Sequence, residues 1–278
     1  MTDGDVSARE RDTELGSDAG RVAIGELLRA QERVPRRSVL RRLFGATPLS
    51  AETQPLYRGV VGEIEVGEAL DRLGADWLVL HALPVGEGAA DIDHLVVGPS
   101  GVFIVSTRNH AGVDVWASQR TFMVAGVRYP YIRDMEYEMG RAERLLTAAA
   151  GRPVEVSGIL AVVAPKTLDV RERQRDVAVL PSSTIVPWLV RQKRTLGVAD
   201  VDQIAAAAKL PSTWFDDGRV PEPEPEFQRE RFERLRTEVR RAWRVQLSWA
   251  VGLSASAVGA FAGLTYAILV NAIGSFGL

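Results

Sequence analysis

The sequence predicts an α/β domain, with a mixed sheet flanked by helices, followed by one transmembrane helix at the C-terminus. Three observations predict this organisation. Short β-branched runs alternate with segments of helical periodicity between residues 57 and 215. A Pro/Glu repeat at 221–226 then separates this domain from an arginine-rich stretch. From 245 to 278 there is no charged residue, and about 20 apolar residues are enough to cross a bilayer.

The composition limits the classes of function. The chain has 278 residues, 46% of them hydrophobic, which is ample for a core. It has no cysteine, which excludes a disulfide framework and a thiolate metal site. The net charge of −2 gives no global attraction for nucleic acid, so any such surface is local. The basic residues are mostly arginine, which is typical of a GC-rich bacterial genome.

We expect four regions. Residues 1–56 form a disordered polar tail without a secretory signal and a basic amphipathic helix, and residues 57–215 form the α/β domain. Residues 216–246 are a Pro/Glu spacer with an arginine-rich juxtamembrane helix, and residues 247–278 form the membrane segment. The arginines of the first region suit an anionic membrane surface, phosphate groups or a solvated linker helix, and the sequence leaves these alternatives open.

A helix predicted over 59–74 carries an acid on its apolar side. At about 100° per residue, Glu63 lies between Val66, Gly67 and Leu70. An unpaired buried carboxylate is costly, so we expect Glu63 to have a cation, a donor or a proton.

Two β-branched segments, 91–97 and 102–108, surround the turn 98–101 and predict a hairpin. A register symmetric about the turn places Leu95 opposite Ile104, on the same face as two polar pairs. Those pairs are Asp93 with Ser106 and Asp91 with Arg108. His94 points to the other face, where we expect a packed or hydrogen-bonded histidine and not a metal ligand.

Further elements complete the α/β pattern. Strands are predicted at 112–116, 121–129, 158–164 and 176–180. Helices are predicted at 132–150, from Ser182 or Ser183 to 194, and at 201–210.

Three ordered blocks resemble one family: Gly59-x-x-Gly-Glu63, Asp91-Ile-Asp-His94, and Gly101-Val-Phe-Ile-Val-x-x-x-Asn109-x-x-Gly112. Together they resemble the nuclease-related domain (NERD) family over about 57–190. The resemblance implies a restriction-endonuclease-like, PD-(D/E)XK fold. It also implies catalytic roles for Glu63 and Asp93, with Mg²⁺ or Mn²⁺ as cofactor.

The third block departs from the family pattern. An acid and a lysine are expected where this chain has Ser106 and Arg108. Serine is a weak neutral ligand, and arginine keeps the charge but is planar and does not deprotonate. The expected metal ligands are therefore Asp93, Glu63 and Asp91, and Asp91 has an alternative as a cross-strand ion-pair partner of Arg108.

Two functions follow from the resemblance. One is a membrane-tethered, metal-dependent hydrolase of nucleic-acid phosphodiesters, with Glu63, Asp93, Ser106 and Arg108 at its site. The other is a catalytically degenerate nucleic-acid-binding or scaffold protein of the same fold.

The uncharged C-terminal segment predicts a single span over about 249–270. Seven arginines between 229 and 244 precede it and predict a protein of the cytoplasmic membrane with its N-terminal domain in the cytoplasm. Gly259 and Gly263 lie on one ridge of small residues, which predicts a homodimer through this helix.

Overall fold

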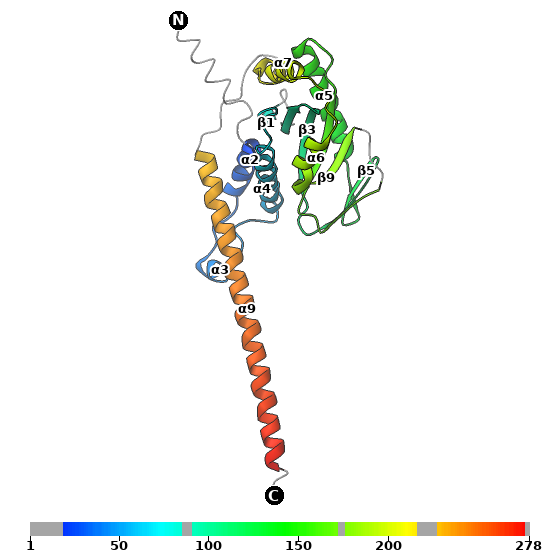
Figure 1. The fold of residues 1–278 in the computed structure, drawn as a ribbon. Helices are drawn as coiled ribbons and strands as arrows, with labels where there is room; N and C mark the ends of the chain where they lie inside the picture. Colours follow the sequence, from blue (N-terminus) through cyan, green and yellow to red (C-terminus); the bar gives the residue numbers. More distant parts are fainter. Residues whose placement is uncertain (1–18, 85–90, 172–175, 216–226, 276–278) are drawn as a thin grey trace. The chain divides into compact units, whose positions relative to one another are not determined.

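The computed structural model describes residues 19–84, 91–171, 176–215 and 227–275. The chain divides into two compact units. The sheet unit comprises Met1–Leu27 and Pro55–Pro225, and the long-helix unit comprises Leu28–Gln54 and Glu226–Leu278. Figure 1 shows the elements of both units, which are described separately below.

Two β-sheets form the frame of the sheet unit. The five-stranded sheet has the order β1-β2-β3-β7-β9. Its strands are β1 (Leu78–Pro84), β2 (Asp91–Gly98), β3 (Gly101–Asn109), β7 (Val156–Val163) and β9 (Val177–Pro181). The four-stranded sheet has the order β6-β5-β4-β8. Its strands are β4 (Asp114–Ser118), β5 (Thr121–Val124), β6 (Val127–Tyr129) and β8 (Thr167–Val170).

Helices cover both faces of the five-stranded sheet. They are α4 (Thr53–Leu70), α5 (Tyr131–Ala150), the 3₁₀ turn η1 (Ser182–Thr184), α6 (Ile185–Arg191), α7 (Val198–Ala208) and α8 (Pro211–Trp214). A further helix, α2 (Arg21–Glu32), begins in this unit.

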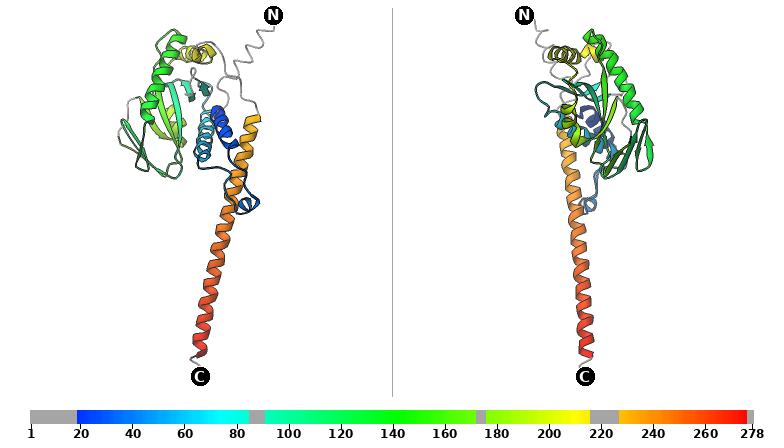
Figure 2. Two further views of the ribbon diagram at one scale, coloured as in Figure 1. Left: turned by 180° about the vertical axis from the view of Figure 1, so that it is seen from behind. Right: turned by 45° about the vertical axis from the view of Figure 1, so that its right-hand side comes forward.

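Alternation along the strands sends side chains into two separate cores. Leu95 and Ile104 pack in one core with α5, α7 and the second sheet. Val96 and Val105 pack in the other core with α4 and α6. The further views in Figure 2 show α5 and α4 on opposite sides of the sheet. The predicted mixed sheet flanked by helices is therefore present.

The hairpin of β2 and β3 has the predicted register. Leu95 pairs with Ile104, and the turn closes with Gly98 opposite Gly101. The segment predicted as one strand over 121–129 is instead two strands. The chain reverses at Ala125 and Gly126, both of which have positive φ. Strands β1 and β8 are not among the predicted strands.

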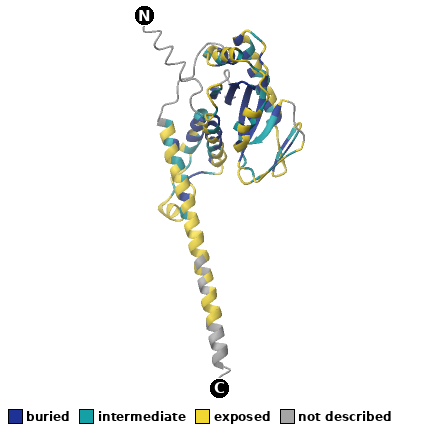
Figure 3. Ribbon diagram, viewed as in Figure 1, coloured by how far each residue is buried: buried dark blue, intermediate teal, exposed yellow. Residues whose placement is uncertain are grey.

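The long-helix unit contains α3 (Val39–Leu43) and α9 (Phe227–Ser275). Much of α9 is exposed in Figure 3. Arg37 forms an ion pair with Glu238 at 2.7 Å, and Arg231 forms one with Glu32 at 2.7 Å. These contacts join the helix to the segment 28–54 within the unit.

The predicted transmembrane helix is wrong. Among the helices in the described part of the chain, none combines the length and the apolar character needed to cross a membrane. Glycine, serine and threonine carry no charge but are not strongly apolar, and they recur in this part of α9 at Gly252, Ser254, Ser256 and Thr265. The expected location in the cytoplasmic membrane as a single-pass protein is wrong on the same finding. Self-association through Gly259 and Gly263 stays a prediction.

Candidate functional site

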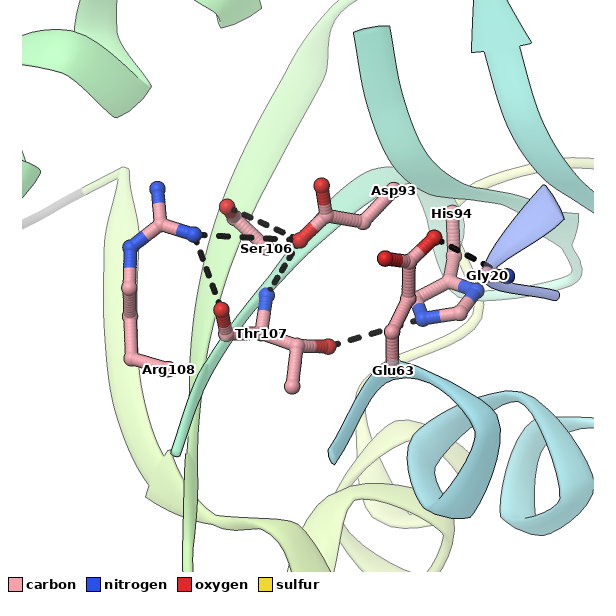
Figure 4. Close-up of polar contacts among 7 residues, drawn as sticks. All are labelled: Gly20, Glu63, Asp93, His94, Ser106, Thr107 and Arg108. Carbon is pink, nitrogen blue, oxygen red and sulfur yellow. Dashed lines mark hydrogen bonds and ion pairs between the residues drawn. The ribbon is translucent and has the colours of Figure 1, made fainter. Parts of the chain in front are cut away.

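Asp93 lies on β2, one residue before His94, whose pairing with Val105 ends the ladder between β2 and β3. Its Oδ2 atom accepts a hydrogen bond from the backbone N–H of Thr107 at 2.6 Å and one from Ser106 Oγ at 3.3 Å. Arg108 Nη1 lies 3.8 Å from the same oxygen (Figure 4). The carboxylate therefore binds the β3 strand where the regular strand pairing stops.

The Arg108 guanidinium is held in a fixed position. Its Nη1 donates to the Thr107 carbonyl at 2.8 Å, and its carbon lies 4.7 Å from the centre of the Tyr131 ring. Tyr131 in turn stacks on Tyr129, with ring centres 5.1 Å apart. Arg108 Nε is buried and has no hydrogen-bond partner among the described residues. The Nε–H donor therefore has no acceptor among the described residues, although the Arg108 side chain as a whole is partly exposed.

A second acid, Glu138 on α5, is affected by the charges of this site. Burial, followed by the charge of Asp93, raises the pKa of the Glu138 carboxyl to about 7, while Arg108 opposes the rise. Burial also raises the pKa of Asp93, against the effect of Arg108 and the hydrogen bonds from Thr107 and Ser106. The charge of Asp93 therefore disfavours ionisation of the Glu138 carboxyl.

Glu138 is not among the predicted site residues, although the sequence carries a signal for it. Glu138 lies three residues after Met135 and four before Ala142, both of which are buried in α5. This is the same helical spacing that identified Glu63 as an acid inside an apolar stripe.

Glu63 is buried in α4, with 9% of its surface exposed, as the helical pattern predicts. Its Oε1 atom accepts a hydrogen bond from the backbone N–H of Gly20 at 3.0 Å. Gly20 is itself buried and belongs to the region expected to be a disordered tail. Gly20 is thus placed in the structure, and the expected disorder of the tail stays a prediction because residues 1–18 lie outside the described part of the chain.

Glu63 and Asp93 belong to different faces of the sheet. Helix α4 packs closely on the side of Thr107, because a Cβ atom added at Gly62 would lie only 3.3 Å from Thr107 Cγ2. The Thr107 hydroxyl lies 3.5 Å from His94 Nε2 on this side, whereas Ser106 and Asp93 meet on the other (Figure 4). A shared site for these two acids, which the resemblance implies, stays a prediction.

His94 has the packed role that the sequence predicts. It is fully buried, and its Nδ1 atom lies 2.8 Å from Nδ1 of His81. His81 Nε2 reaches Asp71 Oδ1 at 3.0 Å. One tautomer assignment satisfies the whole chain: Thr107 donates to His94, His94 donates to His81, and His81 donates to Asp71. Burial and the neighbouring His81 lower the pKa of His94 well below its usual value, which favours this neutral arrangement.

The described residues contain only part of the predicted metal-ligand set. Three donors surround Asp93 Oδ2, Glu63 is on the other face, and the side chain of Asp91 lies outside the described residues. Within the described ranges, no group of three or more histidine, aspartate or glutamate side chains could hold a metal ion. The Asp91–Arg108 pair and the Mg²⁺ or Mn²⁺ cofactor stay predictions.

Comparison with protein families matches residues 58–163 to the nuclease-related domain. The chain contains a nuclease-related domain. The match begins in α4 and ends at Val163, the last residue of β7, so it includes both faces of the hairpin. Glu63, Asp93, Ser106, Arg108 and Glu138 all lie inside the nuclease-related domain.

Two other comparisons, with curated proteins and with solved structures, give no further information about the family of this chain. A search of curated proteins found no match. Among solved structures, the chain is similar to SfsA of Pyrococcus furiosus in complex with Ca²⁺, at 14% identity and a TM-score of 0.19. The similarity covers 58% of this chain and 54% of that one, so the chain spans about half the length of SfsA.

Proposed function

We propose that this protein is a catalytically degenerate, nucleic-acid-binding member of the nuclease-related domain family. The observation that supports this most is the engagement of Asp93. Its Oδ2 atom already has Thr107 N–H, Ser106 Oγ and Arg108 Nη1 around it. The serine also occupies the position of the second family acid, so the site lacks the carboxylate pair that the family pattern supplies.

Arg108 is the group that we propose contacts a nucleic-acid phosphate. Arginine binds phosphate through several N–H donors in one plane. Contact with the Tyr131 ring and the Thr107 carbonyl holds this plane in place. A preorganised cation loses less side-chain freedom on binding, which favours a binding role over a purely structural one.

The proposal is tested with the full chain in two assays. Fluorescence anisotropy with short DNA and RNA strands should detect binding at low salt. Arg108→Ala should weaken it about tenfold or more, since a charge-assisted contact is worth about 1.5–3 kcal/mol. Arg120→Ala changes an exposed arginine in the turn between β4 and β5 and serves as the matched control. Equal binding by all three proteins, or none by the wild type, would refute binding through Arg108.

Cleavage of plasmid DNA and of RNA is assayed with Mg²⁺ and Mn²⁺. We expect no cleavage by the wild type and a gain of activity in Ser106→Glu with Arg108→Lys, which restores the family pattern. Wild-type cleavage that disappears in Asp93→Ala would overturn the degenerate assignment.

The pKa of Glu138 favours a second candidate, a metal-dependent phosphodiester hydrolase in which Glu138 supplies the missing acid. Two carboxyl groups that resist joint ionisation are relieved when a divalent cation binds them. This candidate predicts Mn²⁺ binding by calorimetry and cleavage, both lost in Glu138→Gln and in Asp93→Asn. Binding or cleavage that persists in Glu138→Gln excludes it.

A further inference from the structure

The α3 segment exposes large apolar side chains although it is folded and capped. The Ser38 hydroxyl accepts the N–H of Arg41 at 3.3 Å and begins the helix. Val39 is 82% exposed, Leu40 66%, and Leu43 and Phe44 56% each. No residue of α3 itself is buried. Four adjacent large apolar side chains on one short helix are more than scattered surface residues and indicate a contact surface.

Helix α9 extends this surface and fixes its shape. Trp249 Nε1 donates to the Leu43 carbonyl at 2.9 Å, and its ring lies 5.4 Å from that of Phe44. Gly45 fits closely against α9, because an added Cβ would lie 2.6 Å from the Ala242 carbonyl oxygen. Trp249 keeps 42% of its surface exposed. We call the exposed apolar side chains of Val39, Leu40, Leu43, Phe44 and Trp249 the α3 patch. The α3 segment is among the exposed parts in Figure 3.

The α3 patch is surrounded by positive charge. Residues 33–51 include five arginines and no acid, and residues 239–249 include three arginines and no acid. Arg36, Arg41 and Arg42 are exposed, and none of them forms an ion pair with another described residue. Arg37 differs, because it is paired with Glu238. The charge beside the patch is thus available to an anionic partner.

We infer that the α3 patch binds the surface of an anionic lipid bilayer. The aliphatic and aromatic side chains enter the boundary between headgroups and acyl chains, and the arginines meet the lipid phosphates. Trp249 adds its apolar ring to this contact, while its N–H group stays bound to the Leu43 carbonyl. This contact lies on the membrane surface and requires no helix that crosses it.

The chemistry favours lipid over other anionic or apolar partners. A phosphate backbone alone gives the exposed Val39, Leu40 and Leu43 nothing to pack against. A second copy of the chain would bring two sets of unpaired arginines together, which repel each other. A bilayer of anionic lipids satisfies the apolar side chains and the charges at once.

Co-sedimentation of the full chain with vesicles tests the inference. We expect binding to vesicles of phosphatidylcholine with phosphatidylglycerol at low salt and at least tenfold weaker binding to pure phosphatidylcholine. Leu40→Ser with Leu43→Ser should weaken binding at least tenfold, as should Arg41→Ala with Arg42→Ala. Val198→Ser is the matched control, because Val198 is also 75% exposed but lies on α7 in the sheet unit. Circular dichroism checks that each variant stays helical.

Three results would overturn the inference. One is unchanged vesicle binding in both double variants, and another is equal binding to neutral and anionic vesicles. The third is a wild type that stays in the supernatant but is dimeric by light scattering, with Leu40→Ser and Leu43→Ser giving a monomer, which would identify a second copy as the partner. Arg108→Ala should leave vesicle binding unchanged, so failure of the nucleic-acid proposal and failure of this one are distinguishable.

Discussion

The backbone N–H of Gly20 donates a hydrogen bond to Oε1 of Glu63 across 43 residues of sequence. The buried Glu63 carboxylate therefore has a main-chain hydrogen-bond donor. The N-terminal segment supplies that donor, so the start of α2 is part of the sheet unit's core.

This contact predicts the stability of two variants. Glu63→Leu removes the acceptor and leaves a buried N–H unsatisfied, which costs about 1–3 kcal/mol. Glu63→Gln keeps a carbonyl acceptor of similar shape and should cost less. Urea unfolding of both variants measures the difference. A Glu63→Leu variant at least as stable as the wild type would show that the Gly20 contact contributes nothing.

Asp93 should stabilise the end of the β2–β3 hairpin whether or not it takes part in chemistry. Asp93→Ala leaves the Thr107 N–H without its 2.6 Å acceptor, and we expect a loss of about 1–3 kcal/mol. The Thr107 amide should then exchange with deuterium much faster. Asp169→Ala removes only an exposed ion pair with Arg171 and should change stability by about 0.5 kcal/mol or less. Unaltered exchange at Thr107 in Asp93→Ala would contradict the role assigned to this carboxylate.

His94 should stay neutral at pH values where an ordinary histidine is charged. Its pKa is lowered by burial and by His81, so the unfolded chain binds a proton below about pH 6.5 that the folded chain does not. The His94 contribution to stability is therefore present above about pH 6.5 and is lost as the pH falls. Nitrogen NMR shifts of the imidazole ring report its protonation directly. Titration of His94 near pH 6.5 would exclude the tautomer chain from Thr107 to Asp71.

Glu138 should give stability the opposite dependence on pH. Its pKa is raised to about 7, so between about pH 4.5 and 7 the folded chain binds more protons than the unfolded chain. Its contribution is fully present below about pH 4.5 and is lost as the pH rises through 7. The difference in unfolding free energy between wild type and Glu138→Gln should change by on the order of 1–3 kcal/mol over this range. The His94 contribution is common to both proteins and cancels, so a constant difference would disprove the shifted pKa.

The register of the hairpin and the faces on which its side chains lie depend on local periodicity, so they were predictable without a structure. The register of β2 and β3 follows from alternation on both sides of a short turn, since a slip of one residue would exchange the two faces. Periodicity likewise predicted that Glu63 is buried and that His94 points to the face opposite Asp93. The arginine and serine in the third family block are likewise visible without a structure.

Only the tertiary structure decided which distant groups meet. Gly20 became the donor to Glu63, His81 the partner of His94, and Glu138 the acid whose pKa the charge of Asp93 helps to raise. Periodicity assigns a side chain to a face but does not say which other element covers that face, because this depends on how the whole chain packs. The expected membrane span failed for a related reason. Lack of charge is a local property of the residues, whereas crossing a bilayer needs sustained apolar character along one helix, and no helix in the described ranges has it.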